Sequence, residues 1–508
     1  MKAVFILLDS LNRRCLSLYN HSSEVQTPNI DRLAQRSRVF DQHWCGSAPC
    51  MPARRDILTG RLNFLERPWG GIEPFDHVLP TLLKTKNVFT HMETDHIHYA
   101  ECGGENYWTA FTSWRLHRGA ESDKCNWMPD TTGIPPVVRP ENYPGAWSPS
   151  YMATRKAYGG VEARYSTPRT LTAAADWLER NHEADNFLLW AEGFDPHEPF
   201  DVPDEYLAMY DDVQYDGEMD PYWPAYIIKD YPPKVAERFR TRYKALLTMT
   251  DHYVGRVLEV LDRYDMWEDT LVILTTDHGY LLGEHGYWAK NNIPDYNEVY
   301  HLPMLIAAPG VQPGRCTALT QNIDLFPTIL EYFGIGLDLC RNPIHGRSLW
   351  PLLRGEADTV RDTVLYGTYG KSVCLGDGHR VYIREPADPK VNAPLYLYGS
   401  TMTMLHQHIG YDTMSPEEIN SIEVSHLPWT NYPVYKIAAD KIHWMNLSLR
   451  FDRVNQYAEK SRLYDLEQDY AQEHPICDAV LEELYMEKIR QAMTAHDSPE
   501  EQFQRLGL

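Results

Sequence analysis

Three apolar segments of this chain have the length of a β-strand, and each leads to ionisable side chains. Residues 3–8 precede Asp9, residues 270–276 precede Asp277 and His278, and residues 186–191 lead to a loop that carries His197. Continuous apolar runs of this length are typical of parallel strands that are buried on both faces. Open parallel sheets bind ligands at the carboxyl ends of their strands, so the pattern predicts that these side chains meet at one sheet edge.

The run of residues 47–60, Ser-Ala-Pro-Cys-Met-Pro-Ala-Arg-Arg-Asp-Ile-Leu-Thr-Gly, predicts a short helix with a cysteine at its amino end. Pro52 suits the first turn, where no backbone N–H is needed, and Gly60 is a natural stop. Cys50 then lies at the positive end of the helix dipole. Arg54, four residues on, shares its helix face and could hold a tetrahedral anion by charge-assisted hydrogen bonds.

Cys50 has two other interpretations. A cysteine phosphatase needs an arginine six residues after its thiolate, but that residue here is Asp56, whose charge would repel phosphate. A buried structural cysteine is the commoner fate of a lone cysteine, and this interpretation stays open. The pattern Cys50-x-Pro52-x-Arg54 resembles the signature of the type I sulfatases of the alkaline phosphatase superfamily. In that family the cysteine is oxidised to formylglycine, and the aldehyde hydrate is the nucleophile.

The resemblance extends along most of the chain in family order. Residues 27–34 are similar to the first helix of the family, and residues 463–469 are similar to its Leu-Tyr-Asp-Leu segment. Residues 283–290 resemble the family loop whose lysine, here Lys290, contacts the sulfate. His197 matches the family histidine that faces the leaving-group oxygen.

The resemblance implies a site for one divalent cation, held by Asp9, Cys50, Asp277 and His278. Oxygen-rich ligation favours calcium, and the imidazole makes manganese the alternative. The first strand of the family usually ends in two acids and the later motif is often Asp-Asn, whereas this chain has Ser10 after the first acid and His278 after the second. A similar acid and histidine pair is seen in choline-sulfatase-like and phosphonate monoester hydrolase branches.

The resemblance also implies catalytic and substrate-binding roles. Arg54 and Lys290 would hold the sulfuryl oxygens, and His197 would protonate or hydrogen-bond the departing oxygen, a role that suits imidazole. Where the family shows a Gly-Lys-Trp-His-like run, this chain reads Asp-His-Ile-His, so the family lysine is missing. His96 or His98 would replace it as a donor or base, with His96 as the candidate substrate contact. The alternative for either residue is a histidine packed in the core.

Helical patterns at residues 171–181 and 235–264 alternate with the strands, and residues 304–310 form a further apolar run of strand type. This alternation predicts a doubly wound α/β fold with a mostly parallel sheet. Residues 127–149, rich in Pro, Gly and Trp, predict a surface loop at the pocket rim.

The resemblance implies an alkaline-phosphatase-like sandwich with a large, mostly parallel central sheet flanked by helices. A catalytic domain is expected at residues 1–363. From about residue 364 the chain shows short strand-like runs followed by a helical segment. A smaller C-terminal domain with an antiparallel sheet is therefore expected at residues 364–508.

Composition limits the partners. The chain of 508 residues has 48 Lys and Arg against 71 Asp and Glu, a formal net charge of −23. This charge repels nucleic acid and long polyanions and favours a small substrate with one sulfate group. Nine cysteines without paired short spacings predict a reduced protein with no disulfide framework. The apolar run at the amino end is too short for a signal-peptide core or a membrane span, which predicts a cytoplasmic protein.

The sequence therefore predicts a sulfuric ester hydrolase that releases inorganic sulfate from a small aryl, steroid or carbohydrate sulfate. Its expected partners are that ester and the maturation enzyme that generates formylglycine, with no nucleic acid and no membrane, and the oligomeric state stays open. A phosphonate monoester or phosphodiester hydrolase on the same scaffold is the first alternative. A catalytically idle binding protein, in which Cys50 is never oxidised, is the second.

Overall fold

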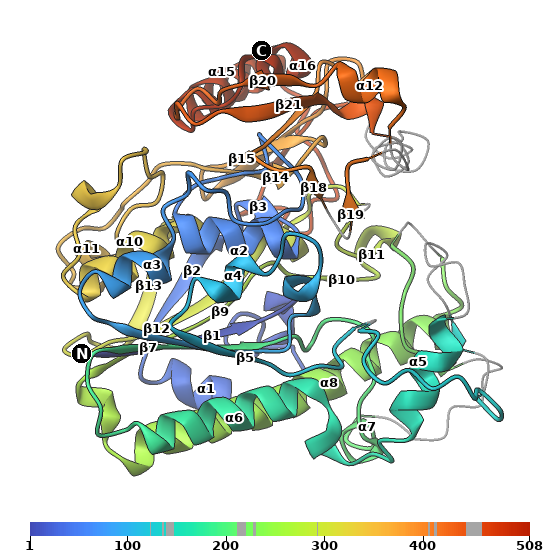
Figure 1. Cartoon of the computed structure of the whole chain (residues 1–508), viewed down its shortest axis with the longest axis vertical. Helices are drawn as coiled ribbons and strands as arrows, with labels where there is room; N and C mark the ends of the chain where they lie inside the picture. Colours follow the sequence, from blue (N-terminus) through green and yellow to red (C-terminus); the bar gives the residue numbers. More distant parts are fainter. Residues whose placement is uncertain are drawn as a thin grey trace.

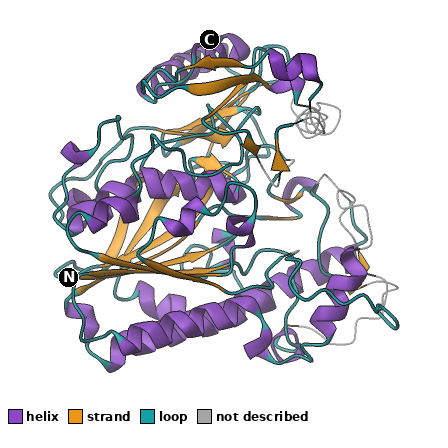
Figure 2. Cartoon of the chain, viewed as in Figure 1, coloured by secondary structure: helices purple, strands orange, loops and turns teal. Residues whose placement is uncertain are grey.

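The computed structural model describes residues 1–121, 123–134, 137–138, 147–210, 220–226, 230–291, 293–404, 407–410, 414–442 and 460–508. At its centre lies a sheet with the strand order β13-β2-β12-β9-β1-β7-β4-β5. Figure 1 and Figure 2 show this sheet between two layers of helices. In chain order its strands are β1 Lys2–Leu8, β2 Arg38–Trp44, β4 Phe89–Thr94, β5 Ser113–Leu116, β7 Phe187–Gly193, β9 Thr270–Thr276, β12 His301–Ala307 and β13 Gly314–Gln321.

The three apolar segments predicted as strands are confirmed as β1, β9 and β7. They are parallel, β1 lies between the other two, and every residue in them is buried. Asp9, Asp277 and the loop with His197 therefore leave the sheet at the same edge. The predicted strand at residues 304–310 corresponds to β12, which runs antiparallel to both of its neighbours. The sheet is thus mostly parallel, as expected.

Both faces of the sheet are covered by helices, because alternate side chains of a buried strand point to opposite sides. Val4 and Ile6 pack with α1 Pro28–Ala34, α6 Ser166–Arg180 and α8 Pro233–Arg263. Phe5 and Leu7 pack with α2 Cys50–Thr59, α3 Leu79–Lys84 and α10 Leu325–Tyr332. The helices predicted at residues 171–181 and 235–264 are confirmed as α6 and α8. The other described helices are α4 Asn106–Thr109, α5 Trp147–Lys156, α7 Asp204–Leu207, α9 Asn297–Tyr300, α11 Trp350–Leu353, α12 Pro416–Asn420, α15 Ala479–Ala495 and α16 Glu500–Leu506.

The C-terminal part forms a second sheet in the order β22-β16-β15-β14-β3. Strands β14 Val364–Thr368, β15 Val373–Gly376, β16 Arg380–Arg384 and β22 Arg462–Asp465 pair antiparallel, as predicted, and pack against α15. The fifth strand, β3 Ser47–Ala48, comes from the N-terminal part and pairs parallel with β14. Because the residues just before Cys50 belong to the C-terminal sheet, the division of the chain at residue 363 stays a prediction.

Small strand pairs complete the described structure. Strands β17 Tyr396–Gly399, β21 Val434–Ala438 and β20 Glu423–Ser425 form a three-stranded sheet, and the two-stranded pairs are β6 Val137–Val138 with β8 Asp220–Pro221, β10 Leu281–Leu282 with β11 Trp288–Ala289, and β18 Thr403–Met404 with β19 Gln407–His408. Of the loop predicted at residues 127–149, residues 135–136 and 139–146 lie outside the described residues. Its place at a pocket rim therefore stays a prediction.

Gly279 ends the Asp-His-Gly turn that follows β9, and it packs directly against the backbone of α9. Its N–H donates to the Val299 carbonyl at 2.8 Å, and a Cβ atom added here would lie 2.0 Å from the Glu298 carbonyl oxygen. We expect Gly279→Ala to destabilise the fold by about 1–3 kcal/mol, because backbone atoms must move to make room. Urea unfolding measures the change. Gly410→Ala, where no atom of the described residues lies within 4 Å of the added Cβ, is the control, and equal unfolding midpoints for the two variants would contradict the prediction.

Candidate functional site

Four predicted ligands meet where β1 and β9 end. Asp9 follows β1, Asp277 and His278 follow β9, and Cys50 is the first residue of α2. One ligand atom from each lies within 4.8 Å of the others, and all four side chains are buried. Cys50 Sγ lies 3.1 Å from His278 Nε2 and 4.0 Å from Asp9 Oδ1. The cysteine therefore faces an imidazole and a carboxylate rather than an apolar core.

The helix that carries Cys50 is held at both ends. It ends at Thr59, and Gly60 follows with φ of 70°, so the predicted glycine stop is confirmed. Asp56 accepts hydrogen bonds from the Ser47 backbone N–H at 2.6 Å and from the Ser47 hydroxyl at 2.9 Å. The acid that excludes a phosphatase loop is thus a buried anchor between α2 and β3.

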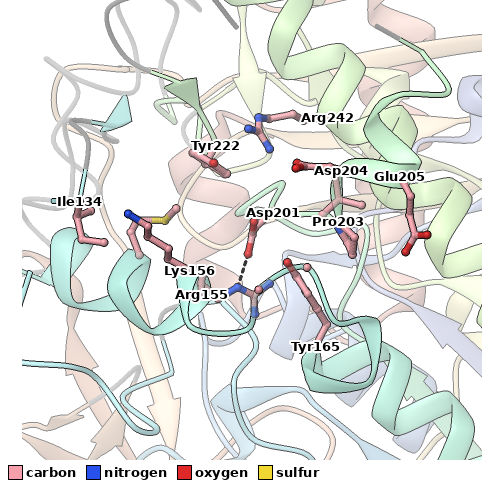
Figure 3. A pocket seen from close by; sticks show the side chains of 14 residues that line it. Ile134, Arg155, Lys156, Tyr165, Asp201, Pro203, Asp204, Glu205, Tyr222 and Arg242 are labelled. Carbon is pink, nitrogen blue, oxygen red and sulfur yellow. Dashed lines mark hydrogen bonds and ion pairs between the residues drawn. The ribbon is translucent and has the colours of Figure 1, made fainter. Parts of the chain in front are cut away.

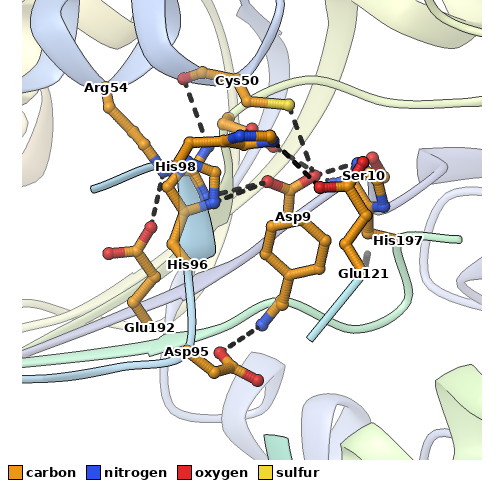
Figure 4. A network of polar contacts seen from close by, with 12 residues as sticks. Asp9, Ser10, Cys50, Arg54, Asp95, His96, His98, Glu121, Glu192 and His197 are labelled. Atoms are coloured by element: carbon orange, nitrogen blue, oxygen red, sulfur yellow. Dashed lines mark hydrogen bonds and ion pairs between the residues drawn. The ribbon is translucent and has the colours of Figure 1, made fainter. Parts of the chain in front are cut away.

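Arg54 is completely buried among three carboxylates, two of which, Asp9 and Glu192, are labelled in Figure 4. Its Nε donates to Glu192 at 2.6 Å, its Nη1 to Asp277 at 2.5 Å and its Nη2 to Asp9 at 2.9 Å. Burial opposes the charge of the guanidinium, but Glu192, Asp277 and Asp9 raise its pKa well above its ordinary value. Arg54 therefore links the ends of β7, β9 and β1, and its expected contact with sulfuryl oxygens stays a prediction.

Glu192 is a site residue that the sequence analysis missed. Besides its bond to Arg54, it accepts hydrogen bonds from the Tyr99 hydroxyl and the Trp190 indole N–H, each at 3.2 Å. Burial raises the pKa of Glu192, and Arg54 opposes that shift. The available signal was a lone glutamate inside the apolar run Phe-Leu-Leu-Trp-Ala-Glu-Gly, because an acid buried in a strand requires a partner.

The residues of the Asp-His pair are oriented as ligands of a cation. His278 Nδ1 donates to the Gly279 carbonyl at 2.8 Å, which directs Nε2 toward Cys50 Sγ. Although burial opposes ionisation, His278 and Arg54 lower the pKa of Asp277 to about 2. Two carboxylates and a ring nitrogen, which would bind a cation in its unprotonated form, are a donor set that fits a divalent cation.

Lys290, the predicted sulfate contact, is buried beside the loop that follows β7. Its Nζ donates to both carboxylate oxygens of Glu198 at 3.2 Å and to the Ser10 hydroxyl at 3.1 Å. Burial opposes the ammonium charge, but Glu198 raises the pKa of Lys290. The Ser10 hydroxyl in turn donates to Asp9 Oδ1 at 2.8 Å. Lys290 is thus connected to the four-ligand group through a single hydroxyl.

His197 lies in the same loop and is also buried. Its Nδ1 donates to the Glu198 backbone carbonyl at 2.5 Å, so the neutral ring has no proton on Nε2. Burial and the charge of Lys290 lower the pKa of His197 to about 3. The imidazole is therefore neutral near pH 7. The acid role expected of His197 stays a prediction.

The two histidines that follow β4 have different surroundings. His96 is completely buried, its Nδ1 lies 3.8 Å from Asp9 Oδ2, and among the described residues neither ring nitrogen has a hydrogen-bond partner. Burial lowers its pKa well below the ordinary value. His98 Nδ1 contacts Glu101 at 2.9 Å, and Nε2 lies 3.1 Å from Glu121. Although burial opposes protonation, Glu121 and Glu101 raise the pKa of His98 to about 10, so this ring is an imidazolium.

A pocket is lined by residues of α5, of α8 and of the segment from Asp201 to Glu205 (Figure 3). Arg155, from α5, donates to Asp201 at 2.5 Å, and its guanidinium stacks over the Tyr165 ring at 4.5 Å from the centroid. Arg242, from α8, lies over the Tyr222 ring at 3.9 Å. The cation of Arg155 is thus held by Asp201, which is not one of the four ligands.

Comparison with known proteins identifies the relatives of this chain. The family model described as Sulfatase matches residues 2–335. The choline-sulfatase of Rhizobium meliloti is 24% identical over 414 residues, which cover 76% of this chain and 78% of the relative. The arylsulfatase of Clostridium perfringens is 23% identical and covers 71% of this chain and 80% of the relative. The crystal structure of the phosphonate monoester hydrolase of Agrobacterium radiobacter superposes with a TM-score of 0.65 and 16% identity, covering 97% of this chain and 96% of that one.

We expect Asp9→Asn to weaken the binding of calcium or manganese by at least about tenfold, because a neutral amide replaces an ionised ligand that Arg54 orients. Elemental analysis of the dialysed protein gives the metal content per chain. Asp201→Asn is the control, since Asp201 is also paired with an arginine but lies outside the four-ligand group. Equal metal content in both variants would show that Asp9 only caps its strand.

Proposed function

The chain belongs to the sulfatase family of the alkaline phosphatase superfamily and is a hydrolase of sulfate esters, and from that premise we propose that it cleaves a small sulfate ester through a formylglycine made from Cys50. Hydrolysis of R–O–SO₃⁻ by water gives the alcohol and hydrogen sulfate. The observation that carries the proposal is the convergence of Cys50 with Asp9, Asp277 and His278 at one buried point.

The surroundings of Cys50 argue against an unmodified thiol as the nucleophile. Burial and the charge of Asp9 raise the pKa of the thiol well above its ordinary value, so the sulfur is protonated at neutral pH. A cysteine must ionise before it can attack. A formylglycine hydrate at this position would supply a hydroxyl group beside Asp277 and His278 instead.

Burial also bears on when the oxidation of Cys50 takes place. The side chain is 1% exposed, and all ten residues of α2 are buried. A modifying enzyme needs the peptide outside the folded core, so oxidation before the completion of folding fits this position. The formylglycine-generating enzyme is therefore the proposed partner in maturation.

In the part of the chain that the structure describes, no helix is long and apolar enough to cross a membrane.

The divalent cation would be held by Asp9, residue 50, Asp277 and His278. The two carboxylates favour calcium, and the imidazole makes manganese the alternative. When bound, the cation would draw electron density from a sulfuryl oxygen and from the nucleophilic hydroxyl. Arg54 bonds to both carboxylates and fixes their positions. The identity of the ion is part of the proposal.

Three side chains of this protein would bind the ester and move its protons, and a fourth would position the groups around them. The ammonium of Lys290 would bind a sulfuryl oxygen and hold the proton that the leaving alcohol requires. His197, neutral, would accept a hydrogen bond at Nε2 from a hydroxyl or N–H group of the alcohol part and so orient the ester. His96 has both ring nitrogens free for hydrogen bonds among the described residues and lies close to Asp9, which suits a substrate contact or a base. Arg54 would act mainly by positioning.

A phosphonate monoester hydrolase on this scaffold is the second candidate. The Asp277 and His278 pair favours it, whereas the names of the curated relatives favour sulfate esters. The structural similarity to a phosphonate monoester hydrolase, at 16% identity, shows the fold alone. Hydrolysis rates of 4-nitrophenyl sulfate and of a phenyl phosphonate monoester, measured under the same conditions, separate the two. An idle binding protein would cleave neither ester.

We expect Cys50→Ala to lower kcat by at least about 10⁴-fold with little change in the fold, because the covalent nucleophile is lost but only a small group leaves the core. Mass spectrometry of the wild-type peptide should find residue 50 lighter by the difference between a thiol and an aldehyde. Cys45→Ala is the control, since Cys45 is equally buried and bonds to the Ser47 carbonyl. Full activity in Cys50→Ala would overturn the assignment.

The proton donor can be identified from leaving-group dependence. We expect Lys290→Ala to lower kcat/KM more for an alkyl sulfate than for 4-nitrophenyl sulfate, because a phenolate leaves without a proton, with a difference of about tenfold or more. His197→Ala should lower both values by the same factor. The measurement is kcat/KM for each variant on each ester. The opposite result, a leaving-group dependence confined to His197→Ala, would restore the acid role to His197.

A further inference from the structure

We propose that Asp95 is a positioning residue for the hydrolysis: its carboxylate holds the turn that carries His197 against the end of β4 and so sets where that imidazole meets the ester. The inference rests on the proposed function, because it concerns how one of the residues assigned to the ester is held. Asp95 opens the Asp-His-Ile-His run, the segment in which this chain departs from the family pattern.

The carboxylate of Asp95 is buried and accepts hydrogen bonds from two other segments. The residue follows β4 directly and is 1% exposed. Its Oδ1 accepts from the Phe194 backbone N–H at 2.8 Å, and its Oδ2 accepts from the Thr167 hydroxyl at 2.7 Å. Phe194 is the first residue after β7, and Thr167 lies in the first turn of α6. One side chain therefore joins the ends of two strands and the start of a helix.

Thr167 extends this connection to the next residue of the turn. Its hydroxyl oxygen accepts a hydrogen bond from the Asp195 backbone N–H at 3.0 Å. The His197 backbone N–H donates to the Phe194 carbonyl at 3.0 Å, which closes the turn of residues 194–197. Both N–H groups at the start of the turn are thus bonded to Asp95, either directly or through one hydroxyl.

The ring of Phe194 packs against both imidazoles assigned to the ester. Its centroid lies 4.2 Å from that of the His197 ring and 5.2 Å from that of the His96 ring. Asp95 precedes His96 in the chain and is bonded to the Phe194 backbone, so loss of its carboxylate would let the two imidazoles move relative to each other. A displacement of about 1 Å in a group that orients a substrate can cost about 10²-fold in rate.

Asp95 is the ionised member of a pair of buried acids. Burial raises the pKa of Asp95 to about 6, against the hydrogen bonds from Thr167 and Phe194. Burial and the charge of Asp95 raise the pKa of Asp195 to about 8. At neutral pH the negative charge is therefore on Asp95, where it strengthens the bonds from the backbone N–H and the hydroxyl.

The test measures kcat/KM on 4-nitrophenyl sulfate and on an alkyl sulfate. We expect Asp95→Ala to lower both values by the same factor, at least about 20-fold, because a misplaced His197 affects both esters alike. Asp95→Asn keeps an acceptor oxygen for the Phe194 N–H and should stay within about threefold of the wild type. When His197→Ala is already present, Asp95→Ala should lower kcat/KM by no more than about threefold, since it acts through that imidazole.

Asp251→Ala is the matched control. Asp251, on α8, is 1% exposed and accepts hydrogen bonds from the backbone N–H groups of Asn29 at 3.1 Å and Ile30 at 2.8 Å, so it is a buried carboxylate that holds α1 instead of the turn. Its removal should lower stability in urea unfolding but leave kcat/KM within about threefold. Equal losses of kcat/KM in Asp95→Ala and Asp251→Ala would overturn the inference, and so would a loss in Asp95→Ala that is undiminished when His197→Ala is present.

Hydrogen exchange followed by mass spectrometry tests the inference without turnover. Asp95→Ala should speed exchange of the amides of residues 194–195 by at least about tenfold, whereas Asp251→Ala should speed exchange at residues 29–30. Unchanged exchange at residues 194–195 would overturn the inference even in an active enzyme. Failure of the wild type to cleave either ester would count against the proposed function alone, and the exchange result would still decide the inference.

A milder variant serves if Asp95→Ala does not fold. Thr167→Val removes the bridging hydroxyl at nearly constant volume, so it should speed exchange of the Asp195 amide and lower kcat/KM alike on both esters. That loss should also disappear when His197→Ala is present. Wild-type exchange and wild-type kcat/KM in Thr167→Val would overturn the inference.

Discussion

A single buried guanidinium makes this site possible. Asp9, Asp277 and Glu192 lie at the ends of three adjacent strands from which water is excluded, and unpaired carboxylates there would repel one another and lose their hydration. Arg54 bonds to all three, and its Nη1 also donates to the Cys50 carbonyl at 3.2 Å. The same cation therefore fixes the edge of the sheet and the first turn of the helix that presents residue 50.

The sequence was sufficient for the parts of the fold in which local pattern and tertiary position coincide. Runs of apolar residues identified β1, β7 and β9, and the acids that follow them meet because adjacent parallel strands end at the same edge. The antiparallel direction of β12 could not be predicted from the sequence, since an apolar run looks the same in either direction. The pairing of β3 with β14 could not be predicted either, because a strand of two residues has no periodic pattern in the sequence.

The histidines after β4 show where sequence reasoning on the site stopped. His96 and His98 are two residues apart and were alternatives for the same role. Their difference comes from partners elsewhere in the chain, since Glu121 holds His98 as an imidazolium while His96 lies neutral beside Asp9. Only tertiary structure can separate them, because the charge of an imidazole depends on which acids are brought within contact distance.

Ser10, in place of the second acid that the sulfatases usually carry after the first strand, changes how Lys290 is held. Its φ of 62° lies in the left-handed region, and its backbone N–H donates to Asp277 at 3.1 Å. Its hydroxyl accepts a hydrogen bond from Lys290 and donates one to Asp9, so it links these two side chains without adding a charge of its own. Lys290 then needs a carboxylate from another segment, and Glu198, in the loop with His197, supplies it. Through these contacts Lys290 links the end of β1 to the loop that carries His197.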